Sequence, residues 1–412
     1  MASVAAPCPA PPGFRKPRWE VADVFGRYGQ AYRQSRPLPV LHLKIMRAIE
    51  LCRTEALGGH LARCTHCGFE KPAYNSCRNR HCPKCQALSK ARWLEARRAE
   101  LLPVGYFHVV FTLPHELNAL VLCNKAVLLA HLFAAVGQTL QAFGENNLGG
   151  KLGFLAILHT WDQKLNAHFH LHCLVPAGVL TDDGERFIAA RETFLFPVKA
   201  LGQVFRGKFL HLLREARNSK QLIYPGQAAQ FKTKAGFSEL VEDLQSKPWI
   251  VYSKPPFGGP EKVLDYLGRY THRVAISNSR IRAVGEHGVT FAYRDRSDGD
   301  KSKIMTLAAE EFIRRFLLHS LPPAFVRIRH FGFLANRAKK VDLARCRELL
   351  GLSAQPPPVE LKSDEVLMQE LTGADPSVCP SCQQGQMRIV AELPVIAPGR
   401  LGQREHARLD SS

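Results

Sequence analysis

Three histidines alternate along one short stretch of the sequence, "NAHFHLHCLV" at residues 166–175. Alternate side chains of a β-strand point to the same face, so His168, His170 and His172 would share one face while the apolar residues between them pack on the other. Burying three imidazoles in register is unfavourable unless a ligand or hydrogen-bonding partners accompany them. The stretch therefore predicts a metal site on a buried strand.

A second strand-like run, "LGFLAILHTWDQ", precedes the histidine run, and the polar residues between them predict a β-hairpin. His159 would then lie across the hairpin and could complete a site of three imidazoles with His170 and His172, although His168 competes for that place. Two or three histidines that leave positions for water and substrate fit a catalytic divalent ion such as Mg²⁺ or Mn²⁺, and the ligands alone also allow zinc. Such an ion could polarise a phosphate oxygen.

The candidate nucleophiles lie in "DYLGRYTHR", within a helix predicted over residues 259–273. Tyr266 and Tyr270 are four residues apart and would project from one face of that helix, which also carries Arg269 and Arg273. A phenol with a pKa of about 10 attacks a phosphate at neutral pH only where a cation or base stabilises the phenolate. The resulting phosphotyrosine would conserve the energy of the phosphodiester bond. Two tyrosines at this spacing are, taken alone, more often half-buried packing residues.

Two Cys-x-x-Cys pairs lie in the N-terminal quarter of the chain, separated by fourteen residues: Cys64, Cys67, Cys82 and Cys85. Two such pairs can close a tetrahedral shell of four thiolates, which predicts a structural zinc site without an open coordination position. The remaining ligand-type residues of this segment could form a second zinc site with two thiolates and two imidazoles: Cys52, His60, Cys77 and His81. The alternatives are that His66 replaces one of these ligands or that the thiols simply pack.

A third pair, Cys379 and Cys382 in "CPSCQQGQM", supplies only two thiols. Two thiolates cannot close a tetrahedral shell, and Cys346 is the one other candidate nearby in the sequence. We therefore interpret this third pair as a vestigial knuckle or a plain turn rather than as a zinc site.

The composition indicates a folded protein whose partner carries phosphates. Of the 412 residues, 46% are hydrophobic, and 56 Lys and Arg against 36 Asp and Glu give a net charge of +20. No stretch approaches about 18 charge-free apolar residues, and the Pro-rich N-terminus lacks the apolar run of a signal peptide, so we expect no membrane association and a cytoplasmic location. In that compartment cysteines are more often metal ligands than disulfides.

Basic residues that could contact a DNA backbone fall in three segments. One group flanks the second Cys-x-x-Cys pair, one accompanies the tyrosines, and one lies in "FVRIRHFGFLANRAKK": Arg78, Arg80, Lys84 and Arg92; Arg269 and Arg273; Arg327, Arg329 and Arg337. In the last segment, Phe325, Phe331 and Phe333 could stack on the bases of single-stranded DNA, and Phe331 and Phe333 could equally pack into the core. The first group could instead be the solvated face of a basic helix.

The pattern of predicted elements indicates an α+β protein with a mainly antiparallel sheet, because strands and hairpins are interrupted by long helices. We expect four parts along the chain. Residues 1–35 form a flexible N-terminal arm and 36–103 a zinc-binding and DNA-binding domain. Residues 104–340 form the catalytic domain, and 341–412 a C-terminal helix, a linker and a largely disordered tail.

Four motifs occur together in order: "YNSCRNRHCPKCQ", "HFHLHCLV", "YLGRYTHRVAISNSRI" and "RIRHFGFLANR". They closely resemble transposases of the insertion-sequence 91 type, which are rolling-circle enzymes of the His-hydrophobe-His (HUH) endonuclease superfamily. The resemblance spans roughly residues 37–340. It implies an HUH endonuclease core, in which a mainly antiparallel sheet flanked by helices carries His170 and His172 beside a tyrosine helix. A small zinc-ribbon-like helical domain precedes this core.

By this resemblance, Tyr266 and Tyr270 are the nucleophiles of a two-tyrosine enzyme. Each would hold a 5′-phosphotyrosine on single-stranded DNA while a free 3′-OH primes replication or attacks the other junction. The spacing of His159 from the histidine pair also resembles that in relaxases, where a third histidine completes the metal site. The implied function is the cleavage and rejoining of single-stranded DNA at transposon ends in rolling-circle transposition.

The histidine and cysteine ligands, together with the resemblance, imply two kinds of cofactor: a catalytic Mg²⁺ or Mn²⁺, and one or two structural Zn²⁺. The expected partners are single-stranded DNA at transposon ends, target DNA and host replication proteins, in the bacterial cytoplasm and associated with the nucleoid. Two alternatives differ in function. A plasmid relaxase or rolling-circle replication initiator would use the same chemistry, whereas a non-enzymatic zinc-ribbon DNA-binding regulator would carry the histidines and tyrosines as packing residues. The segment "CRNRHCPKC" before the core favours the transposase.

Overall fold

The computed structural model describes residues 17–98, 100–191, 193–254, 262, 268, 275–355 and 362–396. The chain divides into two compact units, each assembled from segments that are far apart in the sequence. We call them the histidine unit, residues 94–271 and 318–359, and the cysteine unit, residues 1–93, 272–317 and 360–412. Both contain helices and antiparallel sheets, so the predicted α+β class is confirmed.

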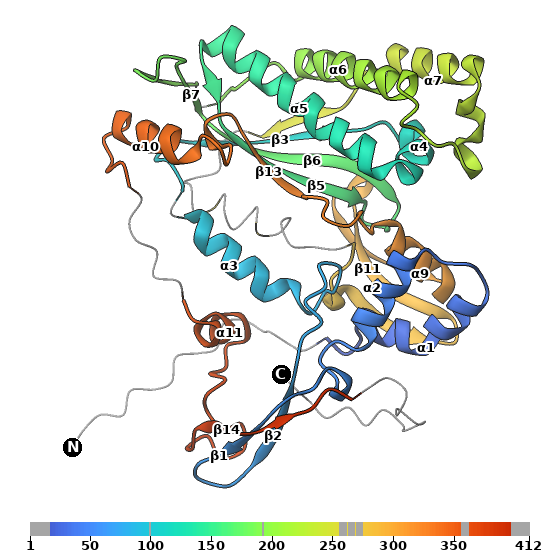
Figure 1. Cartoon of the computed structure of the whole chain (residues 1–412), viewed down its shortest axis with the longest axis vertical. Coiled ribbons are helices and arrows are strands. Elements are labelled where there is room, and N and C mark those ends of the chain that lie inside the picture. The colour runs from blue at the N-terminus through green and yellow to red at the C-terminus, as the bar shows by residue number, and fades with distance from the viewer. Residues whose placement is uncertain are drawn as a thin grey trace. The chain divides into compact units, whose positions relative to one another are not determined.

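A five-stranded antiparallel sheet forms the centre of the histidine unit, with the strand order β13-β5-β6-β3-β9 (Figure 1). Its strands are β3 (Tyr106–Thr112), β5 (Phe154–Trp161), β6 (Ala167–Pro176), β9 (Val251–Lys254) and β13 (Ile328–Phe331). The predicted hairpin is confirmed as β5 and β6, which pair antiparallel. A register shift between His159 and Trp161 marks a bulge near the turn of this hairpin.

Helices cover one face of this sheet: α4 (Asn118–Cys123), α5 (Lys125–Leu148), α6 (Val198–Asn218) and α7 (Lys234–Ser246). Figure 1 shows α5 and α6 lying over the strands. The odd-numbered side chains of β6, such as Phe169 and Leu171, are buried in the core that the sheet shares with these helices. Phe111 of β3 meets Phe205 of α6 edge to face, with ring centroids 5.2 Å apart. The even-numbered residues of β6 therefore lie on the opposite face of the sheet.

Smaller elements complete the described part of the histidine unit. A second, three-stranded sheet consists of β4 (Lys151–Leu152), β7 (Gly178–Leu180) and β8 (Phe187–Ala189), and α10 (Lys339–Leu349) follows β13. Leu180, Phe333 and Cys346 form a small separate core near them. Cys346 is thus a packing residue of the histidine unit.

Helix α5 is long and apolar enough to cross a membrane by length and composition alone. The premise that the chain lacks such a charge-free stretch is therefore wrong, since residues 126–144 contain no Asp, Glu, Lys or Arg. Half of the most apolar 18-residue window of α5 is buried, however. Leu132, Val136 and Leu140 lie in the core beside the sheet, which is the packing of a core helix.

The cysteine unit contains two three-stranded antiparallel sheets, with the strand orders β14-β1-β2 and β10-β11-β12. The strands are β1 (Gly59–Cys64), β2 (Glu70–Tyr74), β10 (Ile281–Gly285), β11 (Gly288–Asp295), β12 (Lys301–Leu307) and β14 (Met387–Leu393). The helices are α1 (Val21–Gln34), α2 (Val40–Glu50), α9 (Ala309–Leu318) and α11 (Asp364–Thr372). Helix α3 (Gln86–Arg98) begins in this unit and continues into the histidine unit.

The flexible arm expected over residues 1–35 is wrong for the part that the structure describes, from residue 17 onward. Helix α1 begins with a capping box, in which the side chains of Glu20 and Asp23 each accept a hydrogen bond from the backbone N–H of the other residue. The fully buried ring of Phe25 meets Phe316 of α9 edge to face, with centroids 5.4 Å apart. Helix α1 is therefore part of the core of the cysteine unit.

The C-terminal region also differs from the expectation of a largely disordered tail after residue 341. Strand β14 pairs antiparallel with β1 along the whole length of β1, from Gly59 to Cys64. The sequence pattern did not reveal this strand because most of its side chains are exposed. The predicted tyrosine helix, residues 259–273, lies outside the described residues apart from Lys262 and Gly268.

Phe25→Ala should lower the free energy of unfolding of the cysteine unit by about 3–5 kcal/mol, because it removes a fully buried ring and its contact with Phe316. Chemical denaturation of the full chain, followed by circular dichroism, measures the change. Val40→Ala is the matched control, since Val40 of α2 is 67% exposed and should change stability by no more than about 0.5 kcal/mol. Equal effects of the two substitutions would contradict the packing of α1.

Candidate metal centres

Three imidazoles meet on the face of the central sheet that the helices α4 to α7 do not cover. The ligand nitrogens of His159, His170 and His172 all lie within 4.8 Å of one another. His159 on β5 is the direct cross-strand partner of His170 on β6, and directly paired residues point to the same face. All three side chains are buried, with exposed fractions of 4, 9 and 5%. The structure thus brings together three of the four histidines that the sequence proposed.

His168 is the histidine that stays outside this group. It lies on the same face of β6 but one step nearer the turn, and its ring centroid is 4.8 Å from that of His170. Its side chain is only half-buried. Of the two candidates for the third place, the geometry brings His159 and not His168 to His170 and His172.

Hydrogen bonds fix how two of these rings can present their nitrogens. The Nδ1 of His170 lies 3.0 Å from the carbonyl oxygen of His168, which can only accept, so Nδ1 is the donor and Nε2 is the nitrogen that the neutral ring would offer to a metal. The Nδ1 of His172 lies 2.8 Å from Nε2 of His108 on β3, and the two rings stack. Partners of this kind orient imidazole ligands and set their tautomers at metal sites.

Two residues that support the group were not identified from the sequence. His108 is buried, and burial, followed by the charge of Lys254, lowers its pKa to about 4, so its ring is neutral at pH 7. The indole of Trp161 stacks on the imidazole of His159, with ring centroids 4.5 Å apart. The alternation in "YFHVVFT" puts His108 on one face of a strand, but its contact with His172 depends on the pairing of β3 with β6, which the sequence does not give.

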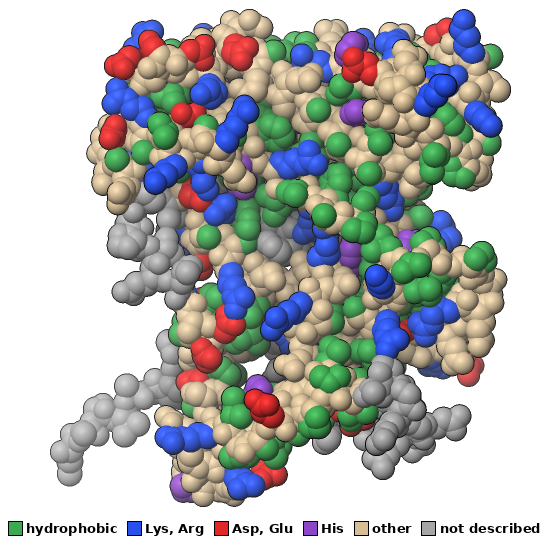
Figure 2. All heavy atoms as spheres, in the orientation of Figure 1, with side chains coloured by type: hydrophobic (Ala, Val, Ile, Leu, Met, Phe, Trp, Pro, Cys, Tyr) green, Lys and Arg blue, Asp and Glu red, His purple; other side chains and the backbone are tan. Residues whose placement is uncertain are grey.

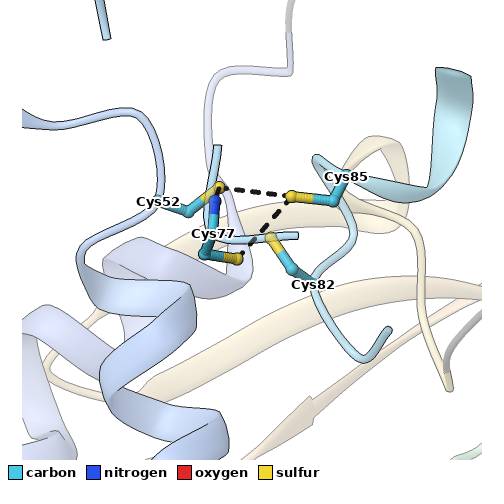
Figure 3. A group of neighbouring side chains, drawn as sticks. All are labelled: Cys52, Cys77, Cys82 and Cys85. Atoms are coloured by element: carbon cyan, nitrogen blue, oxygen red, sulfur yellow. Dashed lines mark hydrogen bonds between the residues drawn. The ribbon is translucent and has the colours of Figure 1, made fainter. Parts of the chain in front are cut away.

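A first group of four thiols lies within the cysteine unit, where the sulfurs of Cys52, Cys77, Cys82 and Cys85 point toward one another (Figure 3). Their ligand atoms all lie within 4.8 Å of one another. The sulfur of Cys85 is 3.5 Å from that of Cys52 and 3.6 Å from that of Cys77. Sulfurs bound to one zinc ion at about 2.3 Å in a tetrahedron are about 3.8 Å apart, so this group has the size of a zinc site.

A second group joins the two ends of the cysteine unit: Cys64, Cys67, Cys379 and Cys382. The sulfurs of Cys64 and Cys382 are 3.7 Å apart, and those of Cys67 and Cys379 are 3.8 Å apart. Backbone N–H groups of Gln384 and Gly385 lower the pKa of Cys382 to about 5, which favours its thiolate at neutral pH. The donor set of this group is again four sulfurs at tetrahedral spacing.

The predicted pairing of the two N-terminal Cys-x-x-Cys pairs with each other is therefore wrong. Cys64 ends β1, and the pairing of β1 with β14 brings the C-terminal cysteines to it, whereas Cys82 and Cys85 lie beside the end of α2. The interpretation of Cys379 and Cys382 as a vestigial knuckle or plain turn is wrong for the same reason.

The two histidines predicted as zinc ligands lie outside both thiol groups. His60 is on β1, opposite Ala73 and Glu392. His81 is buried, and its Nδ1 lies 3.2 Å from the side-chain oxygen of Asn79. The cysteines fill all four positions of each group, so neither imidazole is needed to complete a shell.

The predicted nucleophiles and their arginines, Tyr266, Tyr270, Arg269 and Arg273, lie outside the described residues. Among the other basic candidates, Lys84 forms an ion pair with Glu20 at 2.7 Å, and Arg92 forms one with Asp364. Burial lowers the pKa of the Arg80 guanidinium. Figure 2 shows Lys and Arg side chains distributed over the visible face rather than gathered in one patch.

The aromatic and basic segment near residue 330 packs into the histidine unit. Phe333 is fully buried, and the ring of Phe331 stacks on Phe154 with centroids 4.6 Å apart. The guanidinium of Arg329 lies over the ring of Phe133 at 4.3 Å. Of the two interpretations given for these phenylalanines, core packing holds for Phe331 and Phe333.

Comparison with known proteins identifies the family. Residues 24–113 match the transposase zinc-binding domain, and residues 153–341 match a family described as putative transposases. The chain is 48% identical over 374 residues to a putative transposase of Sinorhizobium fredii, covering 89% of this chain and 94% of that protein. The chain belongs to the insertion-sequence 91 type of transposases.

A more distant relative is the transposase for insertion sequence element IS801 of Pseudomonas savastanoi pv. phaseolicola. It is 29% identical over 339 residues, covering 80% of this chain and 79% of that protein. No solved structure matches the chain. A transposase acts on DNA, which agrees with the net charge of +20, and the zinc-binding domain together with the thiol groups supports Zn²⁺ as a cofactor of this transposase.

Cys77→Ser should lower the zinc content of the purified full chain by about one ion, because it breaks a four-thiolate shell. His60→Ala and His81→Ala are the matched controls and should leave the zinc content unchanged. Metal analysis by mass spectrometry after dialysis measures the content. Loss of zinc in either histidine variant would restore the ligand set first expected from the sequence, and full zinc in Cys77→Ser would contradict the group of four thiols.

Proposed function

We propose that this transposase cleaves and rejoins single-stranded DNA at transposon ends through a 5′-phosphotyrosine, in rolling-circle transposition. The observation that carries the proposal is the group of three buried imidazoles on one face of an antiparallel sheet, in a chain of this transposase family. Tyr266 and Tyr270 are the proposed nucleophiles. Both lie within residues 153–341, the segment that matches the transposase family.

The three imidazoles fit a divalent metal ion by the chemistry of their donors. The neutral ring of His170 would offer Nε2 because its Nδ1 donates to a backbone carbonyl, and the contact with His108 orients the ring of His172. We propose that His159, His170 and His172 hold Mg²⁺ or Mn²⁺. When bound, the ion would supply Lewis-acid polarisation of a non-bridging phosphate oxygen. Three protein ligands leave positions for water and the phosphate.

The proposed cleavage and rejoining need no nucleotide cofactor, because the phosphotyrosine replaces the phosphodiester bond that breaks. The phenolic oxygen of one tyrosine attacks the phosphorus, its proton passes to a base, and a new P–O bond to tyrosine forms. The bond from phosphorus to the 3′-oxygen of the preceding nucleotide breaks, and that oxygen takes up a proton. The 5′ side stays on the tyrosine, and attack by a 3′-OH reverses the step and joins two strands. The second tyrosine could hold a second strand in the same way.

The proposed partners follow from this chemistry and from charge. A net charge of +20 favours binding to polyanions, so we propose single-stranded DNA at transposon ends and target DNA as substrates. Host replication proteins would act with the free 3′-OH that cleavage leaves. We propose that the transposase works in the bacterial cytoplasm, associated with the nucleoid.

Purified protein, incubated with Mn²⁺ and single-stranded oligonucleotides from candidate transposon ends, should form a protein–DNA adduct that survives SDS. The double variant Tyr266→Phe/Tyr270→Phe should form none, because a phenyl ring has no oxygen to bond to phosphorus. Tyr252→Phe is the matched control, since Tyr252 of β9 is a half-exposed phenol outside the proposed helix. An adduct in the double variant, or none in the wild type with any end, would contradict the proposal.

His159→Ala should weaken Mn²⁺ binding by at least about 10-fold, because it removes one of three proposed ligands. His168→Ala removes a neighbouring imidazole from the same face of the sheet and should change the affinity by no more than about 2-fold. Electron paramagnetic resonance of free Mn²⁺ measures both affinities. The reverse order of effects would assign the third ligand to His168.

A further inference from the structure

We propose that Cys64, Cys67, Cys379 and Cys382 bind a second structural zinc ion, which joins the C-terminal segment to the N-terminal zinc-binding domain. The two cysteine pairs are more than 300 positions apart, since Cys64 and Cys382 are separated by 318. The match to the transposase zinc-binding domain ends at residue 113, so it includes only the first of these pairs. The inference concerns the cysteine unit alone and does not depend on the proposed tyrosine chemistry.

The spacing of the four sulfurs fits zinc and excludes disulfides. The measured separations of 3.7 and 3.8 Å match the edge of about 3.8 Å expected for a tetrahedron with zinc–sulfur bonds of about 2.3 Å. A disulfide would need sulfurs about 2.05 Å apart. Four thiolates at this distance repel one another unless a cation lies between them, and a soft divalent ion such as zinc is the cation that four sulfurs select.

Backbone N–H groups turn toward the sulfurs at both pairs. The N–H groups of His66 and Cys67 donate to the sulfur of Cys64 at 3.3 and 3.5 Å. The N–H of Gly385 donates to the sulfur of Cys382 at 3.4 Å. Each Cys-x-x-Cys pair therefore offers the same local geometry, in which N–H dipoles stabilise negative charge on a thiolate.

Gly385 shows how closely the two pairs pack. A β-carbon placed on this residue would lie 2.4 Å from the sulfur of Cys64 and 2.7 Å from the β-carbon of His66. The β-carbon of His66 is attached to the backbone, and the sulfur of Cys64 could move only by turning away from the other three sulfurs. Gly385 thus allows the C-terminal pair to approach the N-terminal pair, and a larger residue there would separate them without removing a ligand.

The sheet that this site closes has very little apolar core of its own. Among the described residues of β1, β2 and β14, only Cys64 is buried, and Ile389 and Val390 of β14 are exposed. Hydrophobic burial therefore contributes little to holding β14 beside β1. In small units of this kind, the free energy of metal binding is free energy of folding. We infer that zinc fixes β14 in place and gives the zinc-binding domain its third strand.

The test counts zinc ions in the full chain. The wild type should hold about two zinc ions per chain after dialysis, and the double variants Cys379→Ser/Cys382→Ser and Cys52→Ser/Cys77→Ser should each hold about one. Hydrogen exchange provides a second measurement, because amides of β14 should lose protection in the first variant and keep it in the second. Zinc content equal to that of the wild type in Cys379→Ser/Cys382→Ser would overturn the proposal.

Gly385→Ala tests the same site with every ligand kept. It should speed the release of one zinc ion to a chelator by at least about 10-fold, because its methyl group collides with Cys64. Gly26→Ala is the matched control, since a β-carbon on Gly26 of α1 meets nothing within 4 Å. Equal release from both variants would contradict the proposed packing. The zinc count and the DNA adduct are independent measurements. If the wild type forms no adduct, the tyrosine proposal fails, but the expected zinc count stays the same.

Discussion

The alternation of side chains along β6 is the constraint on which the histidine unit depends. Its odd-numbered residues, such as Phe169 and Leu171, are buried against the helices that cover the sheet, and this fixes the register of the strand. A slip of one residue would move these apolar side chains to the other face of the sheet and place imidazoles against the helices. The same pleat therefore holds His170 and His172 on the opposite face, beside His159 of the neighbouring strand.

In the cysteine unit, the β14-β1-β2 sheet is not stabilised by an apolar core as the central sheet of the histidine unit is. Where α1 and α9 meet, buried rings such as Phe25 and Phe316 provide an ordinary apolar core. The sheet itself buries almost nothing, and its strands come from segments more than 300 residues apart. Sulfur ligands gathered at tetrahedral spacing can hold such segments together where apolar burial cannot. Zinc binding and folding are therefore coupled in this part of the transposase.

Local patterns could be predicted from the sequence, and long-range partners could not. The alternation in "HFHLHCLV" gave the strand, its polar face and three of the metal-site candidates, because period-two patterning is a property of neighbouring residues. The partners of Cys64 and Cys67 were predicted wrongly, because Cys-x-x-Cys spacing does not say which other pair completes a shell. His108 was missed since its contact depends on the register of β3 with β6, and β14 was missed because its exposed residues show no clear pattern.

We propose that one face of the central sheet holds a divalent ion for phosphate chemistry. A crystal of the full chain soaked in Mn²⁺, with diffraction data recorded at the manganese absorption edge, tests it most directly. We expect an anomalous difference peak within bonding distance of the Nε2 atom of His170 and of one ring nitrogen each of His159 and His172. A Mn²⁺ peak elsewhere in the molecule, with none among these three rings, would contradict the proposed metal site.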